Sequence, residues 1–124
     1  KIALISGRYS PATEYRAKEL KIEDVYNGEL NKKSAFKELK EKYDLADSDI
    51  AYVGDDLIDI PVMKKVAAPI AVANAVTNVK EISIYITNMA GGDGAFREAV
   101  SWIIEQQGRM NDVLRIMKEK IQKQ

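Results

Sequence analysis

Short apolar segments alternate with helical patterns along this chain, and that alternation constrains its fold more than any other feature. Apolar runs of the length of a buried strand lie at residues 2–5, 50–53 and 70–73, and shorter strand candidates lie at 24–26 and 83–86. Helical patterns fill residues 11–20, 31–43, 61–66, 76–82 and 95–107. Strands that alternate with helices form a parallel sheet with crossover helices. We therefore predict an α/β fold, with a Rossmann-like parallel sheet covered by helices on both faces.

The chain is expected to form one domain followed by a helical tail. Its 124 residues are 46% hydrophobic, which is enough for a core. We expect the domain to span residues 1–108 and the tail to span 109–124. The tail carries an apolar face opposite its charged side chains, formed by Met110, Val113, Leu114, Met117 and Ile121. Because such a face needs a partner, we expect the tail to be a contact between subunits of an oligomer.

Composition excludes several classes of function. The chain has neither cysteine nor histidine, so it contains no disulfide, no thiolate metal site and no histidine-based catalysis. Nineteen basic residues balance nineteen acidic ones, which argues against a general nucleic-acid binder. No apolar run approaches the roughly 18 residues of a membrane span, and no signal peptide is visible. We expect neither nucleic acid nor membrane as a partner, and a cytoplasmic location.

Three carboxylates follow the strand at residues 50–53. Asp55, Asp56 and Asp59 come directly after Gly54, where the backbone can turn, and Pro61 could begin a helix with Asp59 as its cap. Crowded carboxylates repel one another unless a cation lies between them, and all-oxygen ligation suits Mg²⁺. The alternative is a capped turn that faces solvent. The surrounding strand and helix favour the metal site.

Two other strand ends would meet these carboxylates, because ligands bind beyond the carboxyl ends of parallel strands. Ser6, Gly7 and Arg8 follow the strand at 2–5, and Lys32 begins a helix after the strand at 24–26. Hydroxyl, amide and ammonium groups bind phosphate oxygens, so the three ends together predict a phosphoryl-transfer site that lacks a nucleophile. Each residue alone has another interpretation: Ser6 could cap a turn, Arg8 could be a surface cation, and Lys33 could take the place of Lys32.

The order of these pieces resembles a known superfamily. Ser6-Gly7-Arg8, Asn31-Lys32 and Gly54-Asp55-Asp56-Leu57-Ile58-Asp59 resemble motifs two, three and four of the haloacid dehalogenase superfamily. Residues 51–63 and 90–98 are similar to the 3-deoxy-D-manno-octulosonate 8-phosphate (KDO 8-phosphate) phosphatases. The resemblance extends from Ile2 to about Gly108 and implies a Mg²⁺-dependent hydrolase of a sugar-acid phosphate. It also implies a homotetramer, in which the tail of one subunit lies near the next active site.

The resemblance implies a role for each residue. Asp55 would bind Mg²⁺, and Asp56 and Asp59 would orient the metal shell, with Asp59 also orienting Lys32. Ser6, Gly7 and Lys32 would hold the phosphoryl group, and Arg8 would face the phosphate or the sugar-acid carboxylate. The site that the resemblance implies therefore consists of Ser6, Gly7, Arg8, Lys32, Asp55, Asp56 and Asp59.

The first motif of the superfamily is absent from these residues. In that motif an Asp-x-Asp on the first strand supplies the nucleophile, which forms an aspartyl-phosphate, and a general acid. Here the only Asp-x-Asp is Asp47-Ser48-Asp49, which precedes a strand and so lies at the opposite end of the sheet. We expect the nucleophile to lie on a preceding strand outside these residues, and the strand at 2–5 to be left exposed without it.

Two alternatives remain open at this stage. One is a non-catalytic oligomerisation module, related to the carboxyl-terminal domain of sialic-acid cytidylyltransferases. The other is a phosphatase or phosphotransferase that acts on a different substrate, since the segment expected to contact substrate is not among these residues.

Overall fold

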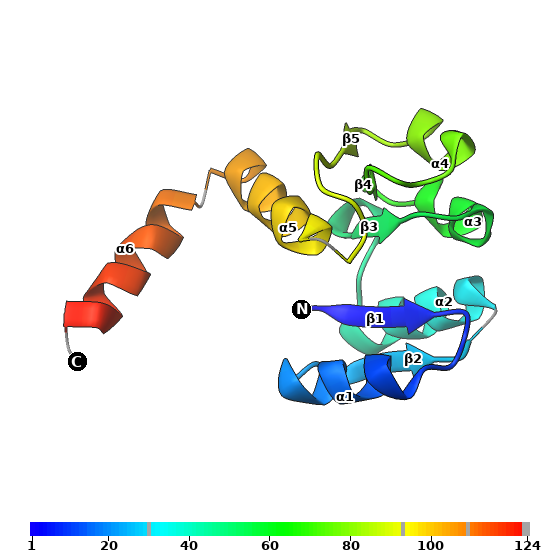
Figure 1. Ribbon diagram of the computed structural model, residues 1–124, viewed down its shortest axis with the longest axis horizontal. Coiled ribbons are helices and arrows are strands. Elements are labelled where there is room, and N and C mark those ends of the chain that lie inside the picture. The colour runs from blue at the N-terminus through cyan, green and yellow to red at the C-terminus, as the bar shows by residue number, and fades with distance from the viewer. Residues whose placement is uncertain (30, 93, 109, 123–124) are drawn as a thin grey trace.

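The computed structural model describes residues 1–29, 31–92, 94–108 and 110–122, and it has the predicted alternation of strands and helices (Figure 1). Two short 3₁₀ turns, η1 (Asp47–Asp49) and η2 (Leu57–Asp59), flank one of the strands. The remaining elements, in chain order, are β1 (Ala3–Ser6), α1 (Pro11–Glu19), β2 (Asp24–Asn27), α2 (Lys32–Tyr43), β3 (Ala51–Gly54), α3 (Ile60–Met63), β4 (Ala68–Ala71), α4 (Thr77–Glu81), β5 (Tyr85–Ile86), α5 (Ala95–Gln106) and α6 (Met110–Gln122).

Every strand pair in the described residues is parallel, which confirms the predicted fold class. The strands form two sheets instead of one continuous sheet: β1 pairs with β2, and β4 lies between β3 and β5. β1 and β3 point the same way in Figure 1 but do not pair with each other. Each therefore has one edge whose backbone groups lack a strand partner among the described residues.

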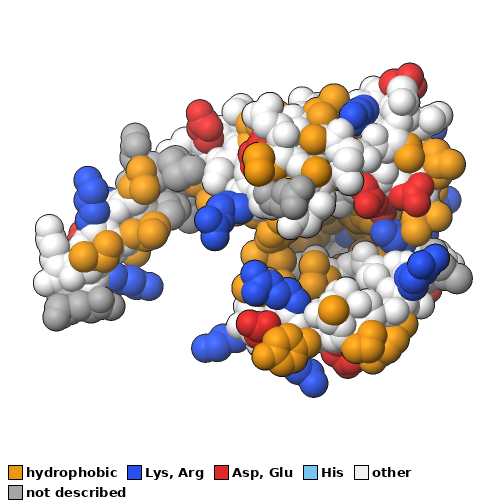
Figure 2. Space-filling view, viewed as in Figure 1, with side chains coloured by type: hydrophobic (Ala, Val, Ile, Leu, Met, Phe, Trp, Pro, Cys, Tyr) orange, Lys and Arg blue, Asp and Glu red, His pale blue; other side chains and the backbone are white. Residues whose placement is uncertain are grey.

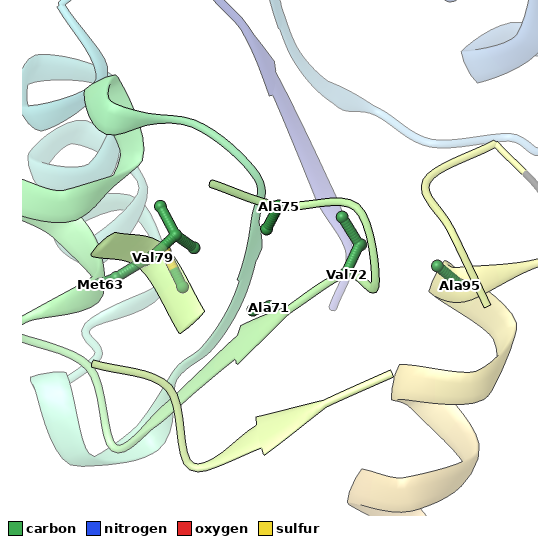
Figure 3. Close-up of a cluster of buried hydrophobic side chains, with 6 residues drawn as sticks. All are labelled: Met63, Ala71, Val72, Ala75, Val79 and Ala95. Carbon is green, nitrogen blue, oxygen red and sulfur yellow. The ribbon is translucent and has the colours of Figure 1, made fainter. Parts of the chain in front are cut away.

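Most of the core lies in the half of the molecule that holds the three-stranded sheet. Its main cluster is formed by the side chains shown in Figure 3: Met63, Ala71, Val72, Ala75, Val79 and Ala95. A smaller cluster of Phe36, Val62 and Val66 joins α2 to α3. The half that holds β1 and β2 is less well covered, since Leu4 and Ile5 are only half-buried and Ile2 is 49% exposed. Apolar strand residues are thus left open on the side of β1 that faces β3.

A groove of about 730 Å³ separates the two sheets. β1 lines one wall and β3 the other, and α5 contributes Phe96, Val100 and Ile103. Figure 2 shows hydrophobic side chains in the hollow between the two halves of the molecule. Only Ala95 and Ala99 of α5 are buried, while Phe96, Val100, Ile103 and Ile104 face the groove. Trp102 stacks on Tyr85 instead.

Two of the predicted elements differ clearly from the prediction, each for a local reason. β4 begins at Ala68 instead of residue 70, because its register with β3 pairs Ala68 with Ala51. The helix expected at 61–66 is replaced by η2 and the short α3. Asp59 does not cap it: the side chain of Asp56 accepts from the Leu57 amide at 2.7 Å, and the Asp59 carboxylate is used elsewhere.

The carboxyl-terminal helix α6 extends away from both sheets, beyond the end of α5 (Figure 1). Gly108, whose φ is +69°, lies between the two helices, in agreement with the break expected there. Leu114, Met117 and Ile121 are exposed on α6. Among the described residues, no helix has both the length and the apolar character that a membrane crossing requires.

Candidate active site

The strand ends that were predicted to converge line one open pocket of about 740 Å³. It lies where β1 and β3 end, and it contains six of the seven predicted site residues: Ser6, Gly7, Arg8, Lys32, Asp55 and Asp56. The seventh, Asp59, lies behind Lys32 and faces the groove. In Figure 2, acidic and basic side chains gather at this end of the molecule. The fold thus brings cationic and anionic groups into the lining of a single cavity.

The turn after β1 is held in place by one hydrogen bond within its own loop and by two from the loop that follows β2. The hydroxyl of Ser6 donates to the carbonyl of Arg8 at 2.7 Å, and the Ser6 carbonyl accepts from the amides of Gly28 and Glu29. Ser10, not Ser6, caps α1 by accepting from the Thr13 amide. Ser6 therefore stabilises a turn in this structure, and it also lines the pocket.

Lys32 enters the pocket because of the way α2 begins. The side chain of Asn31 accepts from the Ser34 amide at 3.2 Å, which caps the helix and makes Lys32 its first residue. The Lys32 ammonium lies 2.6 Å from Asp59 Oδ1, and its side chain is only 10% exposed. Lys33, which the spacing left as an alternative, is exposed. The structure thus distinguishes two lysines that the sequence could not.

Asp59 is a buried carboxylate that accepts hydrogen bonds on both oxygens. Oδ1 accepts from Lys32 Nζ at 2.6 Å and from the Tyr52 hydroxyl at 2.7 Å, while Oδ2 accepts from the amides of Asp55 and Asp56 at 3.0 and 3.2 Å. Burial by itself would raise the pKa of Asp59. The hydrogen bonds from Lys32, Tyr52 and the Asp55 amide outweigh burial and hold the pKa below its ordinary value. Asp59 is therefore a charged structural centre of the site.

Asp55 lacks such compensation. Partial burial, and next the charge and hydrogen bonding of Asp59, raise the pKa of the Asp55 carboxyl, and the Lys32 charge offsets this only in part. A carboxylate in this state gains most from a nearby cation, so Asp55 fits the position of a single Mg²⁺ ligand. The resemblance gives the metal to Asp55 alone, with Asp56 and Asp59 in supporting positions, and that assignment stays a prediction. Asp59 is bound to Lys32, and the described residues contain no group of three possible metal-binding side chains.

Gly54 permits the close approach that builds this site. A Cβ atom at Gly54 would lie 2.6 Å from Met63 Sδ and 2.9 Å from Asp59 Cβ. At Gly91, which also lines the groove, an added Cβ would meet only ordinary contacts of 3.5 and 3.6 Å.

We therefore expect Gly54→Ala to lower the free energy of unfolding by about 1–3 kcal/mol, because Asp59 and Met63 must shift to relieve the overlap. Gly91→Ala is the matched control and should change it by less than about 0.5 kcal/mol. Urea denaturation measures both. Equal stability of Gly54→Ala and the wild type would show that Asp59 is not confined as the structure indicates.

Two polar side chains that hold the site together were not predicted from the sequence. Tyr52 belongs to a predicted strand, and its hydroxyl donates to Asp59 in the turn that follows β3. Glu98 on α5 accepts from the amides of Asn88 and Met89 and from the hydroxyl of Tyr85. These hydrogen bonds to Glu98 hold the loop that leads to Gly91. A tyrosine in a strand and a glutamate in the first turn of a helix are both common, so neither gave a signal.

Comparison with known proteins places these residues in context. Residues 3–98 match the family model described as haloacid dehalogenase-like hydrolase. The chain is 42% identical over 111 residues to the 3-deoxy-D-manno-octulosonate 8-phosphate phosphatase KdsC of Escherichia coli K12, covering 90% of this chain and 59% of that protein. It is 38% identical over 109 residues to KdsC of Yersinia pestis, covering 88% of this chain and 58% of that protein.

Solved structures give the same result. The phosphatase of the same name from Moraxella catarrhalis, in complex with a magnesium ion, a phosphate ion and KDO, matches with a TM-score of 0.86 and 34% identity, over 93% of this chain and 66% of that one. The Yersinia pestis enzyme matches with a TM-score of 0.85 and 37% identity, over 90% and 60%. The chain thus spans about three fifths of the length of the curated relatives it matches.

Proposed function

Because the chain belongs to the haloacid dehalogenase-like hydrolase family, we propose that it forms most of a Mg²⁺-dependent phosphatase that releases phosphate from a sugar-acid phosphate. The proposed substrate is KDO 8-phosphate, which is the substrate named for the relatives at 38–42% identity. The observation that carries the proposal is the pocket in which Ser6, Arg8 and Lys32 line the same space as Asp55. Anion-binding and metal-binding groups in one cavity are what phosphoryl transfer requires.

Each side chain then has a part in the reaction. Lys32 and Ser6 hold the phosphoryl oxygens together with the backbone at Gly7, and Arg8 binds the phosphate or the carboxylate of the sugar acid. Asp55 is the ligand that this chain supplies to Mg²⁺, and Asp56 and Asp59 orient the surrounding groups. When bound, Mg²⁺ neutralises the negative charge that develops on the transferred group. Asp59 also keeps the ammonium of Lys32 in place.

We propose that the nucleophile is an aspartate on a strand outside these residues, which fills the groove between β1 and β3. In the part of the chain that the structure describes, both groove walls are strand edges without a partner strand, and most side chains that line the groove are apolar. A parallel strand placed there would end beside Ser6 and Asp55, and its last residues would face the phosphate. The other Asp-x-Asp does not compete for this role, since Asp47 is bonded to Lys40 and Asp49 to the Ala46 amide.

The function is tested by phosphate release from KDO 8-phosphate by the full-length protein. We expect turnover with Mg²⁺, and its loss when EDTA removes the metal. A folded full-length protein that releases no phosphate would favour the non-catalytic oligomerisation module. If the protein hydrolyses other phosphomonoesters but not KDO 8-phosphate, the proposed phosphatase reaction would stand and the proposed substrate would be wrong.

We further propose that α6 joins subunits, with a homotetramer as the assembly. Support comes from Leu114, Met117 and Ile121, which are 49%, 54% and 67% exposed on a helix that extends from the domain. Light scattering of the full-length protein should give the mass of four chains, and replacement of these three residues by glutamine should lower it. Lys118→Gln with Glu119→Gln is the control, which keeps the apolar face. A monomeric wild type would contradict the proposal.

A further inference from the structure

Tyr52 places a hydroxyl at the centre of the site although its ring belongs to the apolar core. The ring packs against both buried clusters, one formed around Met63 and the other around Phe36. The hydroxyl donates to Asp59 Oδ1 at 2.7 Å. Burial, and next the hydrogen bond and charge of Asp59, raise the pKa of Tyr52, so this hydroxyl stays protonated and remains a donor. The proposed reaction does not use Tyr52 directly.

The carboxylate of Asp59 is saturated by its four donors. A carboxylate has about four lone-pair directions, and Asp59 uses two on the amides of Asp55 and Asp56 and two on Tyr52 and Lys32. Because each oxygen is held by two donors, the carboxylate cannot rotate without loss of a hydrogen bond. Tyr52 and Lys32 share one oxygen, so the position of either donor restricts the position of the other.

This sharing determines where the Lys32 ammonium can lie. An ammonium has three N–H donors, and the bond to Asp59 uses one, while Lys32 also lines the phosphate pocket beside Ser6 and Arg8. If the Tyr52 hydroxyl were absent, Asp59 Oδ1 would have a free lone pair. The ammonium already lies 2.6 Å from Oδ1, so it would come no closer, but it could pivot about that oxygen into the vacated direction and away from the pocket.

We infer that Tyr52 is a positioning residue, which acts through Asp59 to hold the ammonium of Lys32 toward the phosphate pocket. The inference rests on the proposed function for its meaning in catalysis, but the contact that it describes is independent of turnover. This role also explains why residue 52 is a tyrosine and not a phenylalanine, although apolar side chains pack against its ring.

Tyr52→Phe tests the inference, with Tyr85→Phe as the matched control. Tyr85 also donates its hydroxyl to a carboxylate, Glu98, at 2.7 Å, and its ring stacks on Trp102, away from the pocket. Calorimetric titration of the full-length proteins with inorganic phosphate should show affinity about tenfold weaker in Tyr52→Phe and within about twofold of wild type in Tyr85→Phe. The NMR signal of the Lys32 side chain, assigned by its loss in Lys32→Ala, should shift in Tyr52→Phe alone.

Each other result overturns the inference. A residue that only supports the fold would lower the melting temperature and leave both the phosphate affinity and the Lys32 signal unchanged. If the Lys32 signal shifts while the phosphate affinity stays the same, or the affinity falls while the signal stays the same, Tyr52 does not act on phosphate binding through Lys32. Failure of the proposed function is recognised differently: a wild type that binds phosphate but releases none from KDO 8-phosphate would refute that function, and the two variants would still decide the role of Tyr52.

Discussion

Replacement of Asp55 by asparagine should reduce phosphate release by the full-length protein about 1000-fold, because the neutral amide is a poor ligand for Mg²⁺. The same change should leave the fold intact, since it removes a carboxylate whose raised pKa shows that its charge is unfavourable where it lies. Steady-state rates at saturating Mg²⁺ measure the effect. Asp44→Asn is the control, because Asp44 is exposed and has a positive φ of 52°, which asparagine tolerates.

Thermal unfolding separates metal binding from catalysis in the same variant. A cation that binds only the folded protein raises its melting temperature by mass action. We expect Mg²⁺ to stabilise the wild type and Asp44→Asn but not Asp55→Asn. Turnover by Asp55→Asn close to that of the wild type, or stabilisation of this variant by Mg²⁺, would remove Asp55 from the metal site.

Truncation of Asp59 should have the largest effect on stability. Asp59→Ala leaves the Lys32 ammonium, with a side chain that is only 10% exposed, without its counter-charge, and it also removes the acceptor of Tyr52. Breaking a buried ion pair by removal of one partner typically costs about 3–5 kcal/mol. We expect a loss of this size in the free energy of unfolding. Urea denaturation at one fixed protein concentration measures it.

Two comparisons identify the cause of that loss. Asp56→Ala removes the cap hydrogen bond to the Leu57 amide but leaves the ion pair of Asp59 and Lys32, and it should cost about 1 kcal/mol. Lys32→Met combined with Asp59→Leu removes both charges, and it should recover part of the stability while phosphate release stays absent. If Asp59→Ala unfolds within about 1 kcal/mol of the wild type, the ion pair with Lys32 is not a buried interaction.

The fold was predictable because its signals are local. Apolar runs of strand length, helical spacing and turn residues determined the order of the elements, and the structure confirms an α/β fold with parallel strands. The resemblance to the haloacid dehalogenase superfamily is confirmed by the family match. The exposed edge of β1 was expected, because the neighbouring strand was predicted to lie outside these residues. The exposure of the apolar side chains of α5 to the groove was not predictable, because it depends on contacts between distant segments.

In the candidate site, too, features set by neighbouring residues were predictable, and contacts between distant residues were not. Residues next to strand ends were found, because topology alone brings Ser6, Lys32 and Asp55 to one edge. The pairing of Asp59 with Lys32 was expected only from the resemblance, and the turn cap formed by Asp56 was not predicted. Tyr52 was not predicted as a site residue, because the sequence pattern marks its ring only as apolar. The contact that gives it a role is the hydrogen bond from its hydroxyl to Asp59.

The most direct test of the account is to locate the phosphorylated residue of the working enzyme. The full-length protein would be mixed with KDO 8-phosphate and Mg²⁺, quenched in acid, and reduced with borohydride, which converts an aspartyl-phosphate into a stable residue that peptide mass spectrometry can find. The account expects the modified aspartate on a peptide outside residues 1–124, at the end of an apolar strand segment. A modified residue within these 124, at Asp55 or Ser6 for example, would contradict it.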